Sequence, residues 1–489
     1  MTVSSPISRA VVILATLAAV LMANVFFWSH ERNLIHDARG YYELSKIIGE
    51  NGVFRFSDDK HSMDPAFHIL FELRTYGYPL FVAFCALFTN HDKQAVQFVV
   101  FSMQLLIYLL TCHLAAGCLQ SVFRAPGFGT CLYACAVLNP FLLIYTTELL
   151  TDLLSAVTIY LVLVLLLKAG LARGPYADPR EIERPQDRGR IVFIASLCAG
   201  FSAMIRPANI SIVVALLLIS SIRAAITRRL SLLQLSAVGL GLSIPFLPQL
   251  ANNYRTFHKV QALIVGDLTK EQFALGARFL KYGTVAIGNE RPELCYDNPF
   301  RRPDISKPVE FLRKRPLGYA LTLLLHGFAL LDQDFPFPYI RDLHPWYRWP
   351  LSVLNYVFLA GVMYGILIAI RRYARRGRAD KETLAALAIL IMSVSYLTLY
   401  IPCDAENRFS LPLLLLWSPF FVSGLLRLRL VLACRCYKAV ARAGVGLVVF
   451  VGGCIWLSSW MQMQAPRLRD HAEMKGRAEM SVSEFPRRF

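Results

Sequence analysis

Residues 9–28 read RAVVILATLAAVLMANVFFW, an apolar run that is followed directly by the polar residues Ser29-His30-Glu31-Arg32. A transmembrane helix needs about 20 mainly apolar residues to cross about 30 Å of hydrocarbon, and this run is long enough. The small residues that would mark a signal-peptide cleavage site do not follow it. The run therefore predicts a retained first membrane span.

Further apolar runs of similar length follow along the chain. We expect spans at 94–118, 129–147, 152–170, 191–206, 209–226, 232–252, 348–370, 383–401, 410–428 and 444–462. Two shorter stretches, 76–89 and 317–331, are expected to be amphipathic or re-entrant helices at the outer face. The composition agrees, because 56% of the 489 residues are hydrophobic and only 17% are charged, whereas soluble domains average about 25% charged. The sequence predicts an all-α polytopic membrane protein with about eleven transmembrane helices.

The basic residues indicate which way the chain crosses the membrane. The net charge is +18, and arginine-rich loops at 173–190, 223–229, 371–378 and 427–442 carry much of the surplus. Short cytoplasmic loops are enriched in Lys and Arg, so we expect a cytoplasmic N-terminus. Because loop orientation accounts for this charge, no nucleic-acid partner is predicted. The run at 371–378 is also of the kind that binds anionic membrane lipids.

On this topology the outer face collects charged and aromatic residues at the ends of spans. The first outer loop begins HDARGYY at 36–42 and is followed by RTYGYPLF at 74–81. Charge near the bilayer is costly, so such a gathering indicates a functional site. The other outer segments are TTELLTD at 146–152, RPAN at 206–209, NNYR at 252–255 and PCDAENRF at 402–409.

These residue types suit one kind of chemistry. A carboxylate within hydrogen-bond reach of a hydroxyl can act as a general base. Arginines bind phosphate in a bidentate manner and can steady a phosphate leaving group. A lipid donor has its head group at the membrane interface, where these side chains are expected. The set therefore favours group transfer from a lipid-linked phosphate.

The ordered motifs resemble those of the GT-C superfamily of integral-membrane glycosyltransferases. The most similar group is that of the protein O-mannosyltransferases and aminoarabinose transferases, with their bacterial lipopolysaccharide-modifying relatives. The resemblance runs from residue 1 to about residue 420 and rests on Asp-x-x-x-Tyr-Tyr, Arg-x-x-Gly-Tyr-Pro-Leu-Phe, Thr-Glu-x-x-x-Asp, Arg-Pro and Glu-x-Arg-Phe. It implies a GT-C-like fold and inverting transfer of a sugar from a polyprenyl-phosphate donor to a hydroxyl of a glycan, lipid or protein.

The resemblance also implies roles for individual residues. The acid of the first outer loop would be the catalytic base, and Asp37 is the matching position; the alternative is that Asp37 only starts a helix over 41–48. The arginines would hold the donor phosphate or merely anchor span ends, and the tyrosines would stack on sugar or belong to the interfacial aromatic belt. The predicted substrate-binding residues are Tyr42, Arg74, Tyr78, Glu148, Asp152, Arg206, Glu406 and Arg408. Glu148 and Asp152, one helical turn apart, would position the acceptor or the sugar.

No cofactor is predicted. Members of the superfamily often have two adjacent acids in the first outer loop, whereas Ala38 follows Asp37 here, so a divalent metal is compatible with the chemistry but not expected. Asp332 and Asp334 form a D-x-D pattern, but the prolines after it favour a turn. His326 is expected in the core.

Cys295 and Cys403 are both expected on the outer side, where they are either free or paired. We expect residues 1–462 to form a single transmembrane catalytic domain, with outer loops 29–75 and 253–347 forming the active-site face. Residues 463–489 would be a polar C-terminal tail. The expected location is a bacterial inner membrane, with the active site on the periplasmic side.

Two other functions fit a polytopic membrane protein. A lipid flippase or transporter would show inverted repeats, helices broken at mid-membrane and charge deep within spans. A glycan polymerase or ligase would use a lipid-linked oligosaccharide as its donor and would carry one large outer loop late in the chain. The charges of this sequence lie at one boundary and the first outer loop dominates, which favours the glycosyltransferase.

Overall fold

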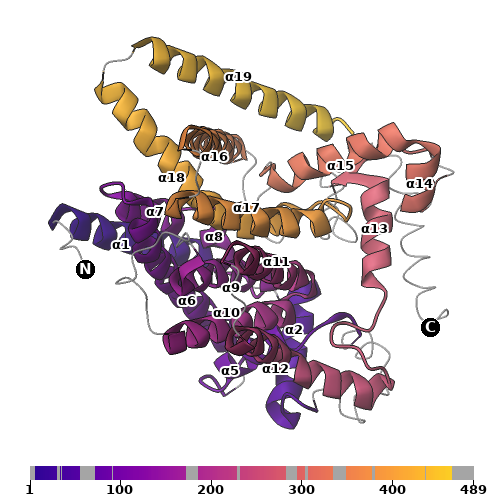
Figure 1. Ribbon diagram of the computed structural model, residues 1–489. Coiled ribbons are helices and arrows are strands. Elements are labelled where there is room, and N and C mark those ends of the chain that lie inside the picture. The colour runs from indigo at the N-terminus through magenta and orange to yellow at the C-terminus, as the bar shows by residue number, and fades with distance from the viewer. Residues whose placement is uncertain are drawn as a thin grey trace.

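The computed structural model describes residues 6–29, 34, 36–55, 72–90, 92–171, 185–227, 232–281, 295–302, 305, 307–333, 348–376, 380–434 and 437–464. This part of the chain is helical apart from turns and one antiparallel pair of short strands (Figure 1). The elements are α1 (Pro6–Trp28), α2 (His36–Asn51), α5 (Gly77–Ala86), α6 (Lys93–Phe123), α7 (Phe128–Val137), α8 (Pro140–Tyr145), α9 (Thr151–Leu166), η1 (Leu167–Leu171), α10 (Pro185–Ile205), η3 (Pro207–Asn209), α11 (Ile210–Thr227), α12 (Leu232–Phe257), α13 (Leu268–Arg278), β1 (Phe279–Lys281), β2 (Tyr296–Asp297), α14 (Pro308–Lys314), α15 (Pro316–Leu331), α16 (Arg348–Arg376), α17 (Lys381–Tyr400), η7 (Asn407–Ser410), α18 (Leu411–Ala433) and α19 (Tyr437–Gln462).

The helix lengths confirm an all-α polytopic membrane protein. Within the described residues, 7 helices are long and apolar enough to cross a membrane, and they lie in α1, α6, α9 and α16 to α19. The spans predicted at 191–206 and 209–226 are present as shorter apolar helices. The stretch predicted at 76–89 forms α5, whose 10 residues extend only about 15 Å, so this helix alone is too short to cross the hydrocarbon core.

The span predicted at 129–147 is wrong in one respect, because it is not a continuous helix. α7 ends at Val137, and α8 begins again at Pro140. Asn139 caps the new helix, since its side-chain oxygen accepts hydrogen bonds from the backbone N–H groups of Phe141 and Leu142 at 3.0 and 3.3 Å. Proline lacks the N–H that would continue α7, and it is well suited to the first turn of α8.

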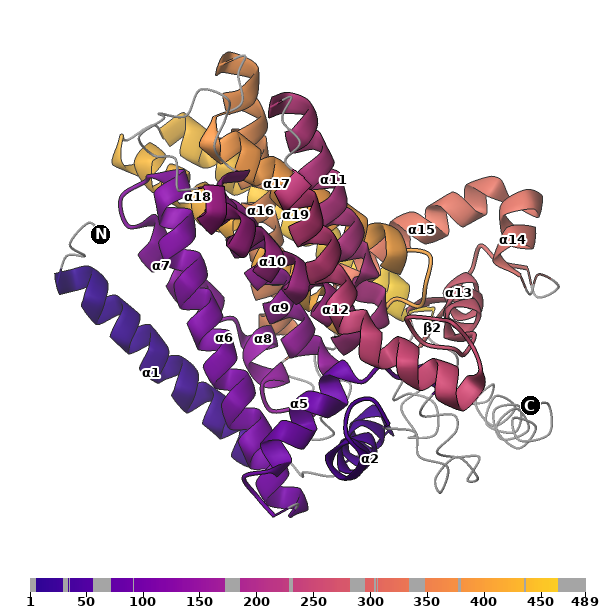
Figure 2. The same cartoon turned by 60° about the horizontal axis from the view of Figure 1, so that its bottom comes forward.

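Small residues allow close packing at two places in the bundle. Ala15, Ala19 and Ala23 recur every four residues on the buried side of α1, and α1 lies along α7 and α6 at the edge of the bundle (Figure 2). Gly365 of α16 lies so close to α18 that a Cβ atom there would overlap the carbonyl oxygen of Phe420. Close backbone approach of this kind is typical of helix pairs in membranes.

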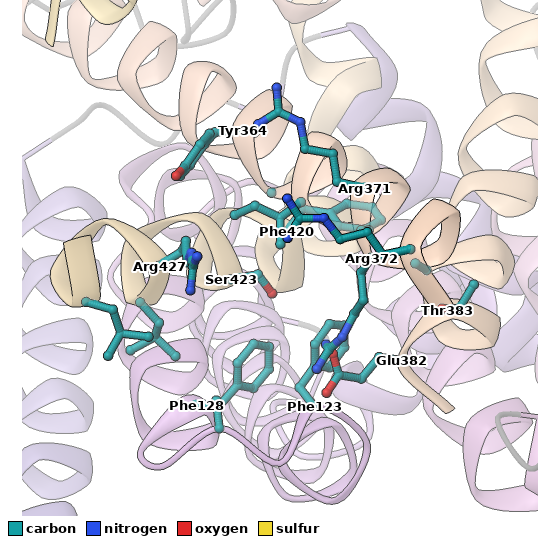
Figure 3. A pocket seen from close by; sticks show the side chains of 18 of the residues that line it. Phe123, Phe128, Tyr364, Arg371, Arg372, Glu382, Thr383, Phe420, Ser423 and Arg427 are labelled. Carbon is teal, nitrogen blue, oxygen red and sulfur yellow. The ribbon is translucent and has the colours of Figure 1, made fainter. Parts of the chain in front are cut away.

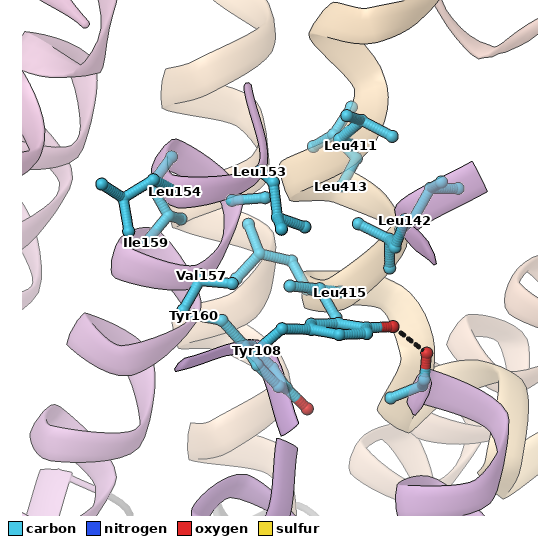
Figure 4. Packing of buried hydrophobic residues seen from close by; sticks show 14 of the residues in the cluster. Tyr108, Leu142, Leu153, Leu154, Val157, Ile159, Tyr160, Leu411, Leu413 and Leu415 are labelled. Carbon is cyan, nitrogen blue, oxygen red and sulfur yellow. Dashed lines mark hydrogen bonds between the residues drawn. The ribbon is translucent and has the colours of Figure 1, made fainter. Parts of the chain in front are cut away.

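The centre of the bundle is filled by aliphatic and tyrosine side chains. Leu153 and Val157 of α9 pack beside Leu413 and Leu415 of α18, and all four are fully buried (Figure 4). Tyr160 shares this core. The core fixes the beginnings of α9 and α18, and both helices begin next to the candidate site described below.

A second contact region joins α15, α16 and α19. Asp332 follows α15 and is fully buried, and its carboxylate accepts hydrogen bonds from Tyr356 at 2.6 Å and Ser458 at 2.8 Å. This agrees with a structural turn, while Asp334 lies outside the described residues. His326 lies in the core as predicted, with its ring nitrogens 2.7 Å from the carbonyl oxygen of Ile401 and 2.9 Å from that of Phe279.

Cys295 and Cys403 are both buried. The Cys403 thiol donates a hydrogen bond to the carbonyl oxygen of Leu399 at 3.2 Å.

Candidate active site

The candidate site is centred on Asp37, at the beginning of α2. The helix expected over 41–48 begins earlier, at His36, so Asp37 lies in its first turn. An acidic side chain is favoured there because the helix dipole is positive at its N-terminus. The carboxylate accepts hydrogen bonds from two arginines: Arg74 at Oδ1, and Arg408 at Oδ2 with a distance of 3.3 Å. Asp37 thus links the segment after α1 to the late Glu-x-Arg-Phe segment.

Gly77 explains why Arg74 lies at this position. A Cβ atom on Gly77 would lie 2.5 Å from the backbone of Met204. Only glycine allows α5 to pack this closely against the end of α10. The approach brings Arg74, which precedes α5, toward the end of α10, where Arg206 follows. The guanidinium group of Arg74 also lies over the ring of Tyr41, 5.1 Å from its centroid.

Side-chain hydrogen bonds from α6 fix the turn between α8 and α9. Gln104 donates hydrogen bonds to the carbonyl oxygens of Thr146 at 3.0 Å and Glu148 at 2.9 Å. Tyr78 donates in turn to the Gln104 oxygen at 3.3 Å. Because α9 begins only at Thr151, Glu148 and Asp152 are not one turn apart on a common helix, and that expectation is wrong.

Asp152, at the beginning of α9, forms an ion pair with Arg206, which lies between α10 and η3. Asp152 lies in the first turn of α9 and its side chain is 1% exposed, and it accepts a hydrogen bond from Arg206 Nη1. The Arg206 guanidinium lies over the rings of Phe409 and Tyr400, at 4.3 and 5.5 Å from their centroids. Cation–π contacts of this kind stabilise a cation that has left water.

Arg408 connects the two pairs. Its side chain is 7% exposed; it donates to Glu406 through Nε, and its Nη1 lies 3.3 Å from Asp37 and 3.9 Å from Asp152. A chain of alternating charges results, in the order Arg74, Asp37, Arg408, Asp152 and Arg206. Residues that lie up to 371 positions apart therefore form one network that is buried at Arg408 and Asp152 and partly buried at Asp37 and Arg74.

The network sets the protonation of its acids. Burial alone would raise the pKa of Asp37, but the guanidinium groups of Arg74 and Arg408 outweigh burial and hold this pKa well below its usual range. Burial raises the pKa of Glu148 to about 7. Burial and the neighbouring Glu406 also raise the pKa of Asp404 to about 7. The site thus combines a carboxylate that is ionised at neutral pH with two acids that titrate near neutrality.

The structure brings together most of the predicted site residues and adds two. Asp37, Arg74, Asp152, Arg206, Glu406 and Arg408 share the charge network, while Tyr78 and Glu148 lie next to it. Tyr41 lies over Tyr78, 5.0 Å between ring centroids, and against Arg74, while the ring of Tyr42 faces Lys46. Tyr41, one of the tyrosines expected to stack on sugar or to belong to the aromatic belt, and Asp404 are the two residues that the structure adds to the predicted set.

The ionisable side chains of the site are mixed in charge. Among the residues that the structure describes, no group of three or more His, Cys, Asp or Glu side chains is arranged to hold a metal ion. The acids of the network are interleaved with arginines instead. Guanidinium groups next to a carboxylate are suited to a phosphate-bearing substrate and an acceptor hydroxyl.

Comparison with known proteins gives structural neighbours only. No protein-family profile matches the chain, and no curated protein does. The solved structures similar to it include the archaeal oligosaccharyltransferase AglB from Archaeoglobus fulgidus in complex with an inhibitory peptide and a dolichol-phosphate, at 13% identity and a TM-score of 0.48. That match covers 95% of this chain and 57% of AglB, so the chain spans just over half of its neighbour's length.

A second neighbour is ArnT from Cupriavidus metallidurans in the apo state, at 14% identity and a TM-score of 0.34. The match covers 85% of this chain and 78% of ArnT.

Proposed function

We propose that the protein transfers a sugar from a polyprenyl-phosphate-linked donor to an acceptor hydroxyl at the outer face of the membrane, with inversion at the anomeric carbon. The observation that carries this proposal is the position of Asp37 between Arg74 and Arg408. A base for the hydroxyl and cations for the phosphate lie side by side, as a single displacement needs. The expected setting is a bacterial inner membrane with the site on the periplasmic side.

The reaction would be one concerted step. The acceptor hydroxyl gives its proton to the Asp37 carboxylate while its oxygen attacks the anomeric carbon of the sugar. The bond between that carbon and the phosphate oxygen breaks, and the electron pair leaves with the polyprenyl phosphate. The charge that develops on the phosphate is stabilised by Arg74, Arg408 or Arg206. No co-reactant is required, and the products are the glycosylated acceptor and polyprenyl phosphate.

The ion pairs of Asp37 couple its basicity to donor binding. While both arginines pair with it, its low pKa makes it a weak base. A donor phosphate competes for the same guanidinium groups. When the phosphate takes one of them, the pKa of Asp37 rises, and the carboxylate accepts a proton more readily. Asp37 would thus be a stronger base with the donor in place than without it.

The neighbouring acids limit the negative charge of the site. Asp37, Asp152 and Glu406 balance the three arginines that pair with them. Glu148 and Asp404 titrate at about 7, so both can be neutral when an anionic phosphate enters. In this proposal Glu148 and Asp152 position the acceptor or the sugar, and Tyr41 and Tyr78 form the aromatic wall of the site.

The test is a transfer assay with the purified full-length protein in liposomes. A radiolabelled polyprenyl-phosphate monosaccharide is added with a mixture of candidate glycan, lipid and peptide acceptors. Time-dependent release of unglycosylated polyprenyl phosphate, accompanied by label in an acceptor, supports the proposal. Donor recovered intact with every acceptor class contradicts it.

One observation favours a lipid flippase as the second candidate. The break between α7 and α8 at Asn139 is the kind of interruption that transporters place at their substrate sites. The same liposomes distinguish the two functions. A flippase moves intact labelled donor between leaflets without releasing polyprenyl phosphate, whereas the transferase releases polyprenyl phosphate.

A further inference from the structure

A cavity lies far from the candidate active site, between α16, α17, α18 and the end of α6 (Figure 3). Its volume is about 570 Å³. Four arginines line it, and among the described residues its one acidic lining residue is Glu382. The arginines are Arg371, Arg372, Arg375 and Arg427.

The remaining walls of the cavity are largely apolar. Phe123, Phe128 and Phe420 line it together with aliphatic residues of α16 and α18. Figure 3 shows the rings of Phe123 and Phe128 beneath the arginine side chains. The cavity thus has a strongly cationic part and an aromatic, aliphatic part, which matches an amphiphile with an anionic head and a hydrocarbon chain.

Most of the positive charge in this cavity is not compensated by the protein. Arg372 pairs with Glu382, and its Nε lies 3.9 Å from Asp380. Within the described part of the chain, Arg371, Arg375 and Arg427 have no ion-pair partner. Three guanidinium groups gathered around one opening repel one another, so a bound anion would relieve a cost that the protein alone leaves in place.

The cavity lies at the opposite membrane face from Asp37. Along α18, 16 residues separate Leu411, beside the active site, from Arg427, which corresponds to about 24 Å of helix. α17 joins the same two regions in the opposite chain direction. Glu382, near its beginning, lines the cavity, and Tyr400, at its end, lies near the active site. The cavity is therefore distinct from the donor site and lies at the face where the arginine loops predict the cytoplasm.

From these observations, we propose that this cavity binds an anionic glycerophospholipid from the cytoplasmic leaflet. Its phosphate would be held by Arg371, Arg375 and Arg427, and the beginning of an acyl chain would pack against the phenylalanine rings. Basic pockets between transmembrane helices at the cytoplasmic face are suited to lipid head groups. The site is independent of the glycosyltransferase proposal, because it uses none of the residues of the outer network.

Binding is measured on the purified full-length protein in mixed micelles, with spin-labelled phosphatidylglycerol and spin-labelled phosphatidylcholine as the two probes. We expect phosphatidylglycerol to bind and phosphatidylcholine to bind at least tenfold more weakly. An Arg375→Gln, Arg427→Gln double variant should lower the phosphatidylglycerol affinity about fivefold for each arginine removed. Arg429→Gln, on the same helix but outside the cavity lining, is the matched control and should change it less than twofold.

Competition experiments separate the sources of the phosphate. Unlabelled phosphatidylglycerol should displace the probe, whereas inorganic phosphate at the same concentration should not. The proposal is overturned by equal binding of the two probes, by displacement with inorganic phosphate or polyprenyl phosphate in preference to phosphatidylglycerol, or by equal losses in Arg429→Gln and the double variant. Because the double variant keeps every residue of the core, a melting temperature equal to that of the unmodified protein shows that lost binding is not lost folding.

Discussion

Removing Arg206 tests how the charge network around Asp37 is held together. Asp152 has a side chain that is 1% exposed, and after an Arg206→Gln change its nearest cation would be Arg408, at 3.9 Å. Arg408 already forms ion pairs with Asp37 and Glu406. Loss of one partner of a buried ion pair typically costs about 3–5 kcal/mol. We therefore expect Arg206→Gln to lower the free energy of unfolding by an amount in this range.

The reverse change should cost less. In Asp152→Asn, the Arg206 guanidinium keeps its positions over Phe409 and Tyr400, and cation–π contacts contribute about 0.5–2 kcal/mol each. The asparagine oxygen also continues to accept a hydrogen bond. We expect a loss of about 2 kcal/mol, toward the low end for charged hydrogen bonds. The double variant should be no less stable than Arg206→Gln alone, because it leaves no unpaired carboxylate.

The measurement is unfolding of the full-length protein in mixed micelles with increasing sodium dodecyl sulfate, followed by circular dichroism. Arg429→Gln serves as the surface control, since it removes an exposed arginine of α18. A double-mutant cycle then gives the coupling between Asp152 and Arg206. Additive single effects, or an Arg206→Gln variant as stable as the control, would refute the buried network.

Three further predictions concern packing, pH and a helix cap. Gly365→Val should destabilise the protein by several kcal/mol, because α16 and α18 touch there; Gly453→Val, with open space around it, should be much milder in the same unfolding assay. Burial raises the pKa of Glu148 from 4.5 to about 7, so its contribution to stability is present below 4.5 and is lost as pH rises through 7. A Glu148→Gln variant should show a smaller fall in melting temperature between pH 5 and 8, and an equal fall would contradict this pKa. Asn139→Ala should cost about 1 kcal/mol by removing the cap of α8, and an unchanged unfolding midpoint would count against the cap.

The sequence predicted the helices of the membrane region because length and hydrophobicity decide them. An apolar run such as 9–28 has few stable alternatives in a bilayer. The break at 138–139 was missed, although the Asn-Pro dipeptide is a known signal for a turn. A hydropathy window averages over such a dipeptide, since the apolar residues continue on both sides of it.

The sequence could predict at which membrane boundary the site residues lie, but not which of them form ion pairs with one another. Membrane topology placed Asp37, Arg74 and Arg408 at the same boundary, and the motifs selected them from the other charged residues. Which arginine contacts which acid depends on the packing of α5 against α10 through Gly77, and no local pattern carries that information. The packing alone reveals that both Arg74 and Arg408 pair with Asp37.

Which of Tyr41 and Tyr42 shares a helix face with Asp37 shows the same limit on a smaller scale. Both tyrosines follow Asp37 on α2, and consecutive residues point about 100° apart on a helix. Asp37 and Tyr41 are four residues apart, so they share a face of α2 once the helix is known to begin at His36. The later start expected from the sequence left that phase undetermined.

The most direct test of the central claim compares sugar transfer by the unmodified protein, Asp37→Asn and Glu43→Gln. Glu43 is an acid on the same helix whose side chain pairs with Lys46, so it is a matched control. The rate of polyprenyl phosphate release is measured in the liposome assay. A catalytic base predicts a loss of about 10²–10⁴-fold in Asp37→Asn and a change of less than about twofold in Glu43→Gln. Full activity in a correctly folded Asp37→Asn variant would contradict the account.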